Sequence, residues 1–166
     1  MKHWYAIYTH VQQEVWAYNN LRERGLEVYL PRYLKTRRHA RKMDTVKTPL
    51  FPRYLFARAD IGAGERPAMA YAQGVSYVVG FGGSLASVRD EIIDEIRARE
   101  DETGLIVMGD GPGFKPGQRV RVRQGALCDQ IGLFQCTADD QRVFFLLDLM
   151  GRQVKARVES HMLVAD

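Results

Sequence analysis

The sequence is poor in the residues and runs that mark several common classes of protein. Its two cysteines, Cys128 and Cys136, lie close together without a second pair, so a disulfide framework is not expected. No window approaches the roughly 18 to 20 consecutive apolar residues that a membrane span needs. The opening stretch, MKHWYAIYTH, also lacks the pattern of a signal peptide. We therefore expect a cytoplasmic protein that does not enter a membrane.

The motifs of catalysis and cofactor binding are missing as well. The four histidines, His3, His10, His39 and His161, are scattered without the spacing of metal ligands. The glycine-rich stretches GFGGS and GDGPG lack the strand–loop–helix context of a phosphate-binding loop. No serine stands in a nucleophile elbow. We expect neither an enzyme nor a bound metal or cofactor.

Charge is distributed unevenly along the chain. The net charge is +4 over 166 residues. Residues 1–58 hold 12 Lys and Arg against 4 Asp and Glu, so this part carries about +8 and the remainder about −4. Such a basic front half predicts contact with a polyanion.

The first hundred residues show the periods of both strands and helices. Strands are expected at 4–8, 28–34, 51–59 and 74–81, and helices from Thr9 to Arg24, at 67–72 and at 90–99. Thr9 is a candidate N-cap, Gly25 a candidate C-cap, and Val11, Val15, Tyr18 and Leu21 a candidate apolar stripe. The basic segment 35–47 is expected as an exposed loop or hairpin tip. The order predicts an α+β sandwich, β-α-β-β-α-β followed by a helix, over residues 1–100.

The rear of the chain has a different pattern. Residues 101–113 are first acidic and then glycine-rich, which predicts a flexible linker. Short strands at even spacing over 114–166 predict a small β-barrel, with Phe114, Val120, Val122, Ile131 and Phe134 in its core. The segment RVFFLLDLMGRQVKARVES satisfies both a strand and a helix period, although Gly151 would cost a helix about 1 kcal/mol. The barrel is the expected fold, and an α-helical hairpin stays an open alternative.

The stretch PLFPRYLFAR places aromatic side chains beside prolines. In an extended strand Tyr54 and Phe56 share one face, while Leu55 and Ala57 share the other. Both aromatics could simply be core. The alternative is that they join Tyr8 in an uncovered aromatic row, and exposed aromatic patches commonly mark protein–protein sites.

Four motifs in order carry a family resemblance. WYAIYT, PLFPRYLFAR and GVSYVVGFGG resemble the N-terminal domain of the NusG family of transcription elongation factors. FKPGQRVRVRQGALCDQIG resembles the KOW domain that follows it. PLFPRYLF and GVSYVVGFG are most similar to the specialised, RfaH-like branch of that family rather than to its housekeeping factor.

The resemblance implies docking on the clamp helices of the RNA polymerase β′ subunit, which disfavours pausing. By motif match, the polymerase-binding residues are Tyr8, Phe51, Pro52, Tyr54, Phe56 and Phe81. A second contact with the gate loop of the β subunit is in question, because residues 65–70, ERPAMA, lack the polar cluster that makes it in the specialised branch.

The resemblance also implies contact with upstream DNA and the non-template strand. The basic segment offers Lys35, Arg37, Arg38, Arg41, Lys42 and Lys47 to phosphates. The first helix and its entry offer His10, Gln13, Asn20 and Arg24 to bases, with Gln73 nearby. Glu14 and Glu23 place negative charge on the first helix, where a DNA-binding surface would favour positive charge.

Two further expectations concern partners and alternatives. The family's KOW domain recruits a ribosomal small-subunit protein or a termination factor, and in the specialised branch it can fold as a helical hairpin over the aromatic patch until DNA releases it. A monomer is expected. The alternatives are a housekeeping factor of general action, and an RNA-binding or ribosome-associated module.

Overall fold

The computed structural model describes residues 1–107, 120–122, 142–143, 146–147, 150 and 163–165. The chain divides into two compact units, Met1–Val107 and Met108–Asp166, which are described separately here. Among the described residues, no helix is both long and apolar enough to cross a membrane.

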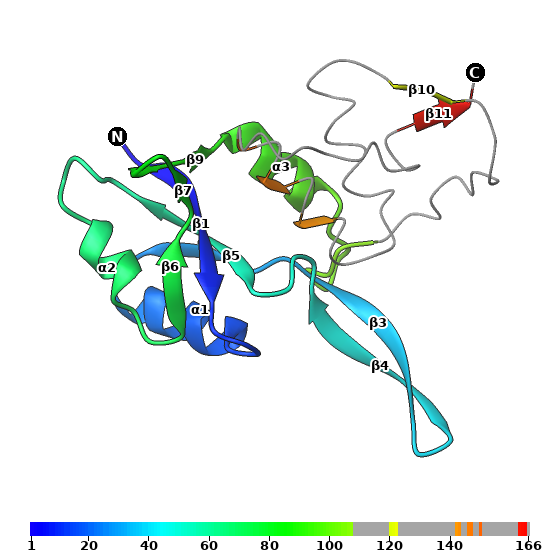
Figure 1. Ribbon diagram of the computed structural model, residues 1–166. Helices are drawn as coiled ribbons and strands as arrows, with labels where there is room; N and C mark the ends of the chain where they lie inside the picture. The colour runs from blue at the N-terminus through cyan, green and yellow to red at the C-terminus, as the bar shows by residue number, and fades with distance from the viewer. Residues whose placement is uncertain (108–119, 123–141, 144–145, 148–149, 151–162, 166) are drawn as a thin grey trace. The chain divides into compact units, whose positions relative to one another are not determined.

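An antiparallel five-stranded sheet organises the first unit (Figure 1). Its strands are β1 (His3–Thr9), β2 (Glu27–Tyr29), β5 (Tyr54–Ala59), β6 (Val75–Val78) and β9 (Ser87–Val88). The order is β2-β5-β1-β6, and β9 also pairs with β1. The expected strand at 74–81 is divided, because β7 (Gly80–Phe81) leaves this sheet to pair with β8 (Ser84–Leu85). The α+β sandwich is thus present in the first unit.

Three helices accompany the sheet: α1 (Glu14–Glu23), α2 (Arg66–Ala70) and α3 (Asp90–Ala98). The expected N-cap of α1 is wrong, since Thr9 is the last residue of β1 and Gln13 occupies the cap position. The expected stripe is also wrong at its start. Val11 and Val15 are 65% and 51% exposed, because the helix begins only at Glu14 and turns Ala17 and Leu21 inward.

The end of α1 follows the expected glycine signal. Gly25 has φ +83°, its N–H donates to the carbonyl of Arg22 (2.9 Å), and the N–H of Leu26 donates to that of Leu21 (3.3 Å). These two bonds form a Schellman motif, in which glycine is favoured because the left-handed backbone has no Cβ clash. Leu21 and Leu26 both lie in the core, which completes the motif.

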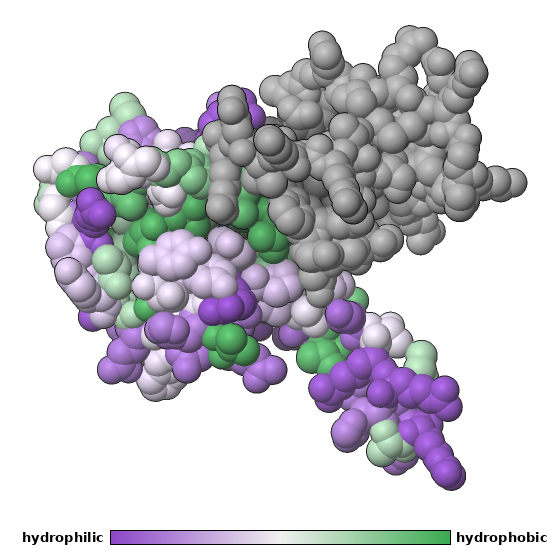
Figure 2. Space-filling view, viewed as in Figure 1, coloured by the Kyte–Doolittle hydropathy of each residue, from purple (hydrophilic) through white to green (hydrophobic). Residues whose placement is uncertain are grey.

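The basic segment forms a hairpin that extends away from the sheet (Figures 1 and 2). Strands β3 (Arg32–His39) and β4 (Lys42–Pro49) pair over their whole length, from Arg32↔Pro49 to His39↔Lys42. The expected strand at 28–34 is therefore two strands, β2 and β3, with the break at Leu30 and Pro31. Ala40 and Arg41 make the two-residue turn with φ of 49° and 65°, as a type I′ turn requires. The expectation of a hairpin tip is confirmed.

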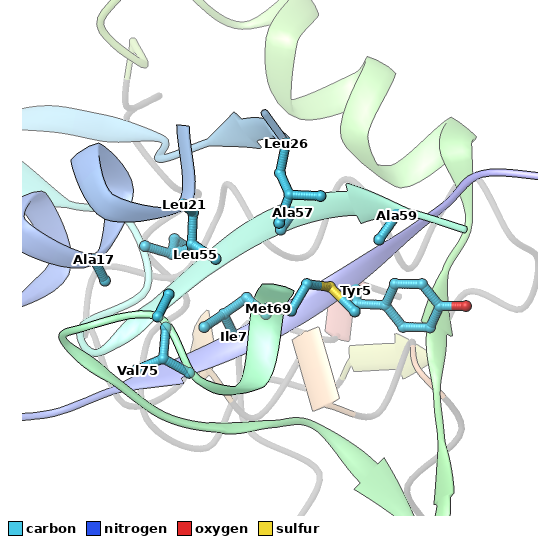
Figure 3. Close-up of a cluster of buried hydrophobic side chains, with 11 residues drawn as sticks. Tyr5, Ile7, Ala17, Leu21, Leu26, Leu55, Ala57, Ala59, Met69 and Val75 are labelled. Atoms are coloured by element: carbon cyan, nitrogen blue, oxygen red, sulfur yellow. The ribbon is translucent and has the colours of Figure 1, made fainter. Parts of the chain in front are cut away.

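The main core lies between one face of the sheet and helices α1 and α2 (Figure 3). Ile7 and Leu55 supply the sheet side, Leu21 and Met69 the helix side, and all four are fully buried. Strand alternation then sends Tyr8, Tyr54 and Phe56 to the opposite face. The sheet therefore has a helix-covered aliphatic face and a second, aromatic face.

Residues 101–107 belong to the first unit, so the expected linker at 101–113 does not begin at 101. The Asp101 carboxylate accepts hydrogen bonds from the N–H groups of Thr103 (2.8 Å) and Leu105 (3.2 Å). The N–H of Ile106 donates to the carbonyl of Arg32 (2.8 Å), and Ile106 is buried. These bonds fix the turn against β3. Residues 108–113 lie outside the described residues.

The second unit is described at a few positions. β10 (Val120–Val122) pairs antiparallel with β11 (Leu163–Ala165), and both lie within residues 114–166, where the sequence predicts short strands. Arg142, Val143, Leu146 and Leu147 are helical where the barrel prediction places a strand, and the N–H of Met150 donates to the Leu146 carbonyl (3.1 Å). Phe114, Ile131 and Phe134 lie outside the described residues, so the barrel stays a prediction.

Candidate functional site

Three tyrosines from adjacent strands form a row across the second face of the sheet. Tyr8 of β1 is directly opposite Tyr54 of β5 and Tyr77 of β6. The centroid of the Tyr8 ring lies 5.1 Å from that of the Tyr54 ring and 4.8 Å from that of the Tyr77 ring. These separations are typical of favourable aromatic pairs. We call Tyr8, Tyr54 and Tyr77 the tyrosine row.

The tyrosine row includes a residue that sequence reasoning missed. Tyr77 is two residues from Val75, so simple alternation would put both on one face. A register shift between Tyr8 and Thr9 interrupts the pairing of β1 with β6. Because of it, Val75 packs in the aliphatic core while Tyr77 joins the aromatic face and stays 49% exposed. No signal in the sequence fixes such a bulge.

The aromatic patch is less open than the sequence suggested. Phe51 and Phe56 are fully buried and Tyr54 is 8% exposed, whereas Tyr8, Pro52 and Phe81 are half-buried. Phe51 packs edge-on against Phe56, with centroids 5.9 Å apart. The expectation of an uncovered row is therefore wrong for Tyr54 and Phe56, which are buried as the core reading of this strand had it. Tyr8, Pro52, Tyr77 and Phe81 are the more accessible members of the patch.

Helix α3 packs against the end of this face that is formed by Trp4 and Tyr29. The guanidinium of Arg97 lies 5.2 Å from the ring centroid of Trp4 and 4.9 Å from that of Tyr29. Tyr29 donates its hydroxyl hydrogen to Glu100, and burial together with this bond raises the pKa of Tyr29 far above its ordinary value. The Trp4 end is thus covered, since Trp4 is 3% exposed, which leaves the Tyr8–Tyr77 end as the candidate docking surface.

The turn before β5 holds an arginine against the tyrosine row. The N–H of Tyr54 donates to the carbonyl of Phe51 (2.9 Å), which closes a β-turn with Pro52 and Arg53 at its centre. Arg53 has φ +69°, so the turn is type II with arginine where glycine is favoured. The Arg53 guanidinium stacks over Tyr8, 4.2 Å from the ring centroid. Sequence reasoning did not single out Arg53.

The hairpin concentrates exposed positive charge. Lys47, near the base of the hairpin, is exposed like Lys35, Arg37, Arg38, Arg41 and Lys42. Arg37 is engaged by Asp44 through two bonds of 2.9 and 3.2 Å, which raises the pKa of Arg37. The space-filling view shows hydrophilic residues covering most of the hairpin (Figure 2). The structure thus gathers the predicted phosphate-binding residues on one projecting ribbon.

The predicted base-reading residues lie around α1. His10 and Gln13 are exposed before the helix, and the N–H of His10 donates to the carbonyl of Gly74 (3.0 Å), beside Gln73. Asn20 and Gln73 line a hollow of about 760 Å³. Arg24 donates to the carbonyl of Tyr71 (3.0 Å), two residues before Gln73. The structure therefore brings this set to one side of the unit.

Two features of the hollow bear on base recognition. Trp16, which lies within the helix expected from Thr9 to Arg24, lines it and is 55% exposed. Glu23 lines it too, so the unfavourable negative charge expected from the sequence is present. The side-chain NH₂ of Asn20 donates to the Trp16 carbonyl (2.9 Å). The side-chain oxygen of Asn20 is therefore the atom available to accept a hydrogen bond from a base.

Residues 65–70 offer no exposed polar cluster. The Glu65 carboxylate accepts the N–H of Asp60 (2.7 Å) and so closes the turn before α2, while Met69 is fully buried. This segment therefore gives no support to a gate-loop contact. In the part of the chain that the structure describes, no group of three or more His, Cys, Asp or Glu residues could hold a metal ion.

Comparison with known proteins identifies the family. The family model described as "Transcription termination factor nusG" matches residues 2–97. The chain belongs to the NusG family. Its homologues are transcription termination/antitermination factors, which are not enzymes. Proteins of this family bind RNA polymerase.

Individual relatives match along almost the whole chain. The NusG transcription termination/antitermination protein of Thermus thermophilus is 29% identical, with 97% of each chain covered. That of Staphylococcus carnosus is 24% identical, with 95% of this chain and 92% of that protein covered. A solved structure of Thermotoga maritima NusG aligns over 75% of this chain and 74% of that one, with 21% identity and a TM-score of 0.45.

Proposed function

We propose that this protein is a transcription elongation and antitermination factor that docks on the β′ clamp helices of RNA polymerase. The docking residues are Tyr8, Phe51, Pro52, Tyr54, Phe56 and Phe81, joined by Tyr77. The observation that carries the proposal is the tyrosine row. It places adjacent aromatic rings on a sheet face that α1 and α2 do not cover, and aromatic side chains are enriched at protein interfaces.

The docking residues divide by exposure into two groups. Tyr8, Pro52, Tyr77 and Phe81 supply accessible contact surface. Phe51, Tyr54 and Phe56 are buried and support the strand and the turn. A factor bound in this way favours one conformation of the polymerase clamp and so suppresses pausing. That effect needs no bond chemistry, since a ligand shifts a conformational equilibrium by binding one state better.

Nucleic acid forms the second contact in this proposal. The hairpin residues Lys35, Arg37, Arg38, Arg41, Lys42 and Lys47 contact phosphates of the upstream DNA. His10, Gln13, Asn20, Arg24 and Gln73 contact bases of the non-template strand. Their gathering on one side of the first unit supports this assignment.

Two versions of the function differ in their dependence on DNA sequence. PLFPRYLF and GVSYVVGFG favour a specialised, RfaH-like factor that acts at particular elements. The relatives named NusG, aligned over nearly their full length, favour a general factor. Equal binding to elongation complexes of unrelated non-template sequence would select the general factor. In either version the second unit acts as a KOW domain that recruits a ribosomal protein or a termination factor.

The test is binding of the full-length chain to bacterial core RNA polymerase, with Tyr77→Thr as the probe. Tyr77 is half-exposed, and threonine suits a strand, so the variant should fold. Loss of a buried interface tyrosine typically costs 1–2 kcal/mol or more, so we expect affinity to fall about tenfold. The control is Tyr71→Thr, which removes a 77% exposed tyrosine after α2. Unchanged binding by Tyr77→Thr would contradict the proposed surface.

A further inference from the structure

Arg53 occupies a backbone position that does not favour it. A type II turn needs positive φ at its third residue, and glycine adopts that conformation without the Cβ clash that arginine suffers. Residues held in such conformations cluster at functional sites, where the surroundings impose them. The question is therefore what the arginine side chain contributes there.

The backbone contacts of Arg53 do not explain the side chain. The N–H of Arg53 donates to the Glu14 carboxylate (3.0 Å), and its carbonyl accepts the N–H of Thr9 (2.8 Å). These bonds tie the turn to α1 and to the end of β1. Glycine would make both bonds equally well and with less strain, so neither requires arginine.

The side-chain contacts of Arg53 instead present it at the docking surface. Nε donates to the Thr9 carbonyl (3.1 Å), and the guanidinium carbon lies over the Tyr8 ring, 4.2 Å from its centroid. Arg53 is half-buried, and none of the ion pairs found among residues 1–107 includes it. The guanidinium is thus fixed in direction, with its two Nη groups still able to donate.

We propose that Arg53 is a specificity-determining residue of the docking surface and pairs with a carboxylate on the polymerase. This inference rests on the proposed function. A guanidinium held in a fixed plane suits bidentate pairing with a carboxylate, and an apolar surround strengthens such a pair. The Glu14 carboxylate beside the turn makes the site less favourable for a polyanion, and the stacked tyrosines favour a protein surface.

Stability and affinity should respond differently in the test. Arg53→Gly in the full-length chain relieves the strained backbone but loses the Nε bond to Thr9 and the stacking on Tyr8, so its unfolding temperature should stay close to that of the wild type. The same variant loses the charge-assisted pair, and its affinity for core RNA polymerase free of nucleic acid should fall about tenfold. The loss should shrink as salt is raised, because the missing interaction is ionic. Arg53→Lys keeps the charge without the planar fork, so it should restore only part of the affinity.

Each remaining outcome has a distinct meaning. If Arg53→Gly binds as the wild type does while Tyr77→Thr binds weakly, the inference about Arg53 fails and the proposed function stands. If Arg53→Gly weakens binding only when nucleic acid is present, Arg53 contacts phosphate and the carboxylate assignment is overturned. If the wild-type chain does not bind polymerase, the proposed function fails and this inference fails with it.

Discussion

The hairpin offers the most quantitative prediction about function. We would replace Arg38, Arg41 and Lys42 together by glutamine. All three are exposed near the tip, and none is engaged as Arg37 is by Asp44. Because the hairpin strands pair over their whole length, the change should remove charge without disturbing the fold.

The expected magnitude follows from counterion release. Each phosphate contact contributes about 0.9 to the slope of log K against log salt for duplex DNA and about 0.7 for a single strand. Loss of all three contacts should therefore reduce the slope by about 2 to 3. Between about 50 and about 200 mM salt, the wild type should lose roughly 20- to 40-fold more affinity than the variant.

The assay measures binding of labelled full-length protein to elongation complexes across a salt series. The control replaces Lys2, Arg66 and Arg89 by glutamine, which changes the net charge equally at exposed sites away from the hairpin. A general charge effect would lower both slopes alike. If the hairpin variant keeps the wild-type slope, the hairpin does not contact phosphates and the reasoning is refuted.

Two further predictions concern stability. Gly74 has φ +87°, and an added Cβ would lie 2.9 Å from the backbone nitrogen of Ala17, so Gly74→Ala should lower the free energy of unfolding by about 2 to 5 kcal/mol in denaturant melts. Gly64→Ala is the control for Gly74→Ala, because Gly64 has φ +82° but no atom within 4 Å of an added Cβ. It should lose only the stability that the strained backbone conformation costs, without the cost of a steric clash. Hydrogen bonds from Thr103 and Leu105 hold the pKa of Asp101 below its usual value. The stability that Asp101 supplies is therefore present above about pH 4, its unfolded pKa, and lost as pH falls through the depressed folded value. Asp101→Ala should thus have a lower melting temperature than the wild type at pH 7. If this difference in melting temperature persisted well below the depressed folded pKa of Asp101, the prediction would be contradicted.

The sequence by itself determined the α+β class and the two-sidedness of the sheet. Strand alternation separates Leu55 and Ala57 from Tyr54 and Phe56 whatever the partner strands are, because that period belongs to the extended backbone. The signal at Gly25 is equally local, since a left-handed C-cap depends on the residue itself. The charged segment predicted an exposed hairpin because few apolar residues were available to bury it.

Only the tertiary structure decided which residues share the candidate site. The bulge between β1 and β6 places Tyr77 beside Tyr8, and a register is set by non-local packing that no short motif specifies. The exposure of Val11 and Val15 depended on where α1 begins, which Ala17 and Leu21 determine by packing on the sheet. For Arg53 too, the sequence predicts the local structure and the tertiary structure decides the contact. The sequence neighbours of Arg53 indicate a turn, but its stacking on Tyr8 results from contact between strands far apart in the chain.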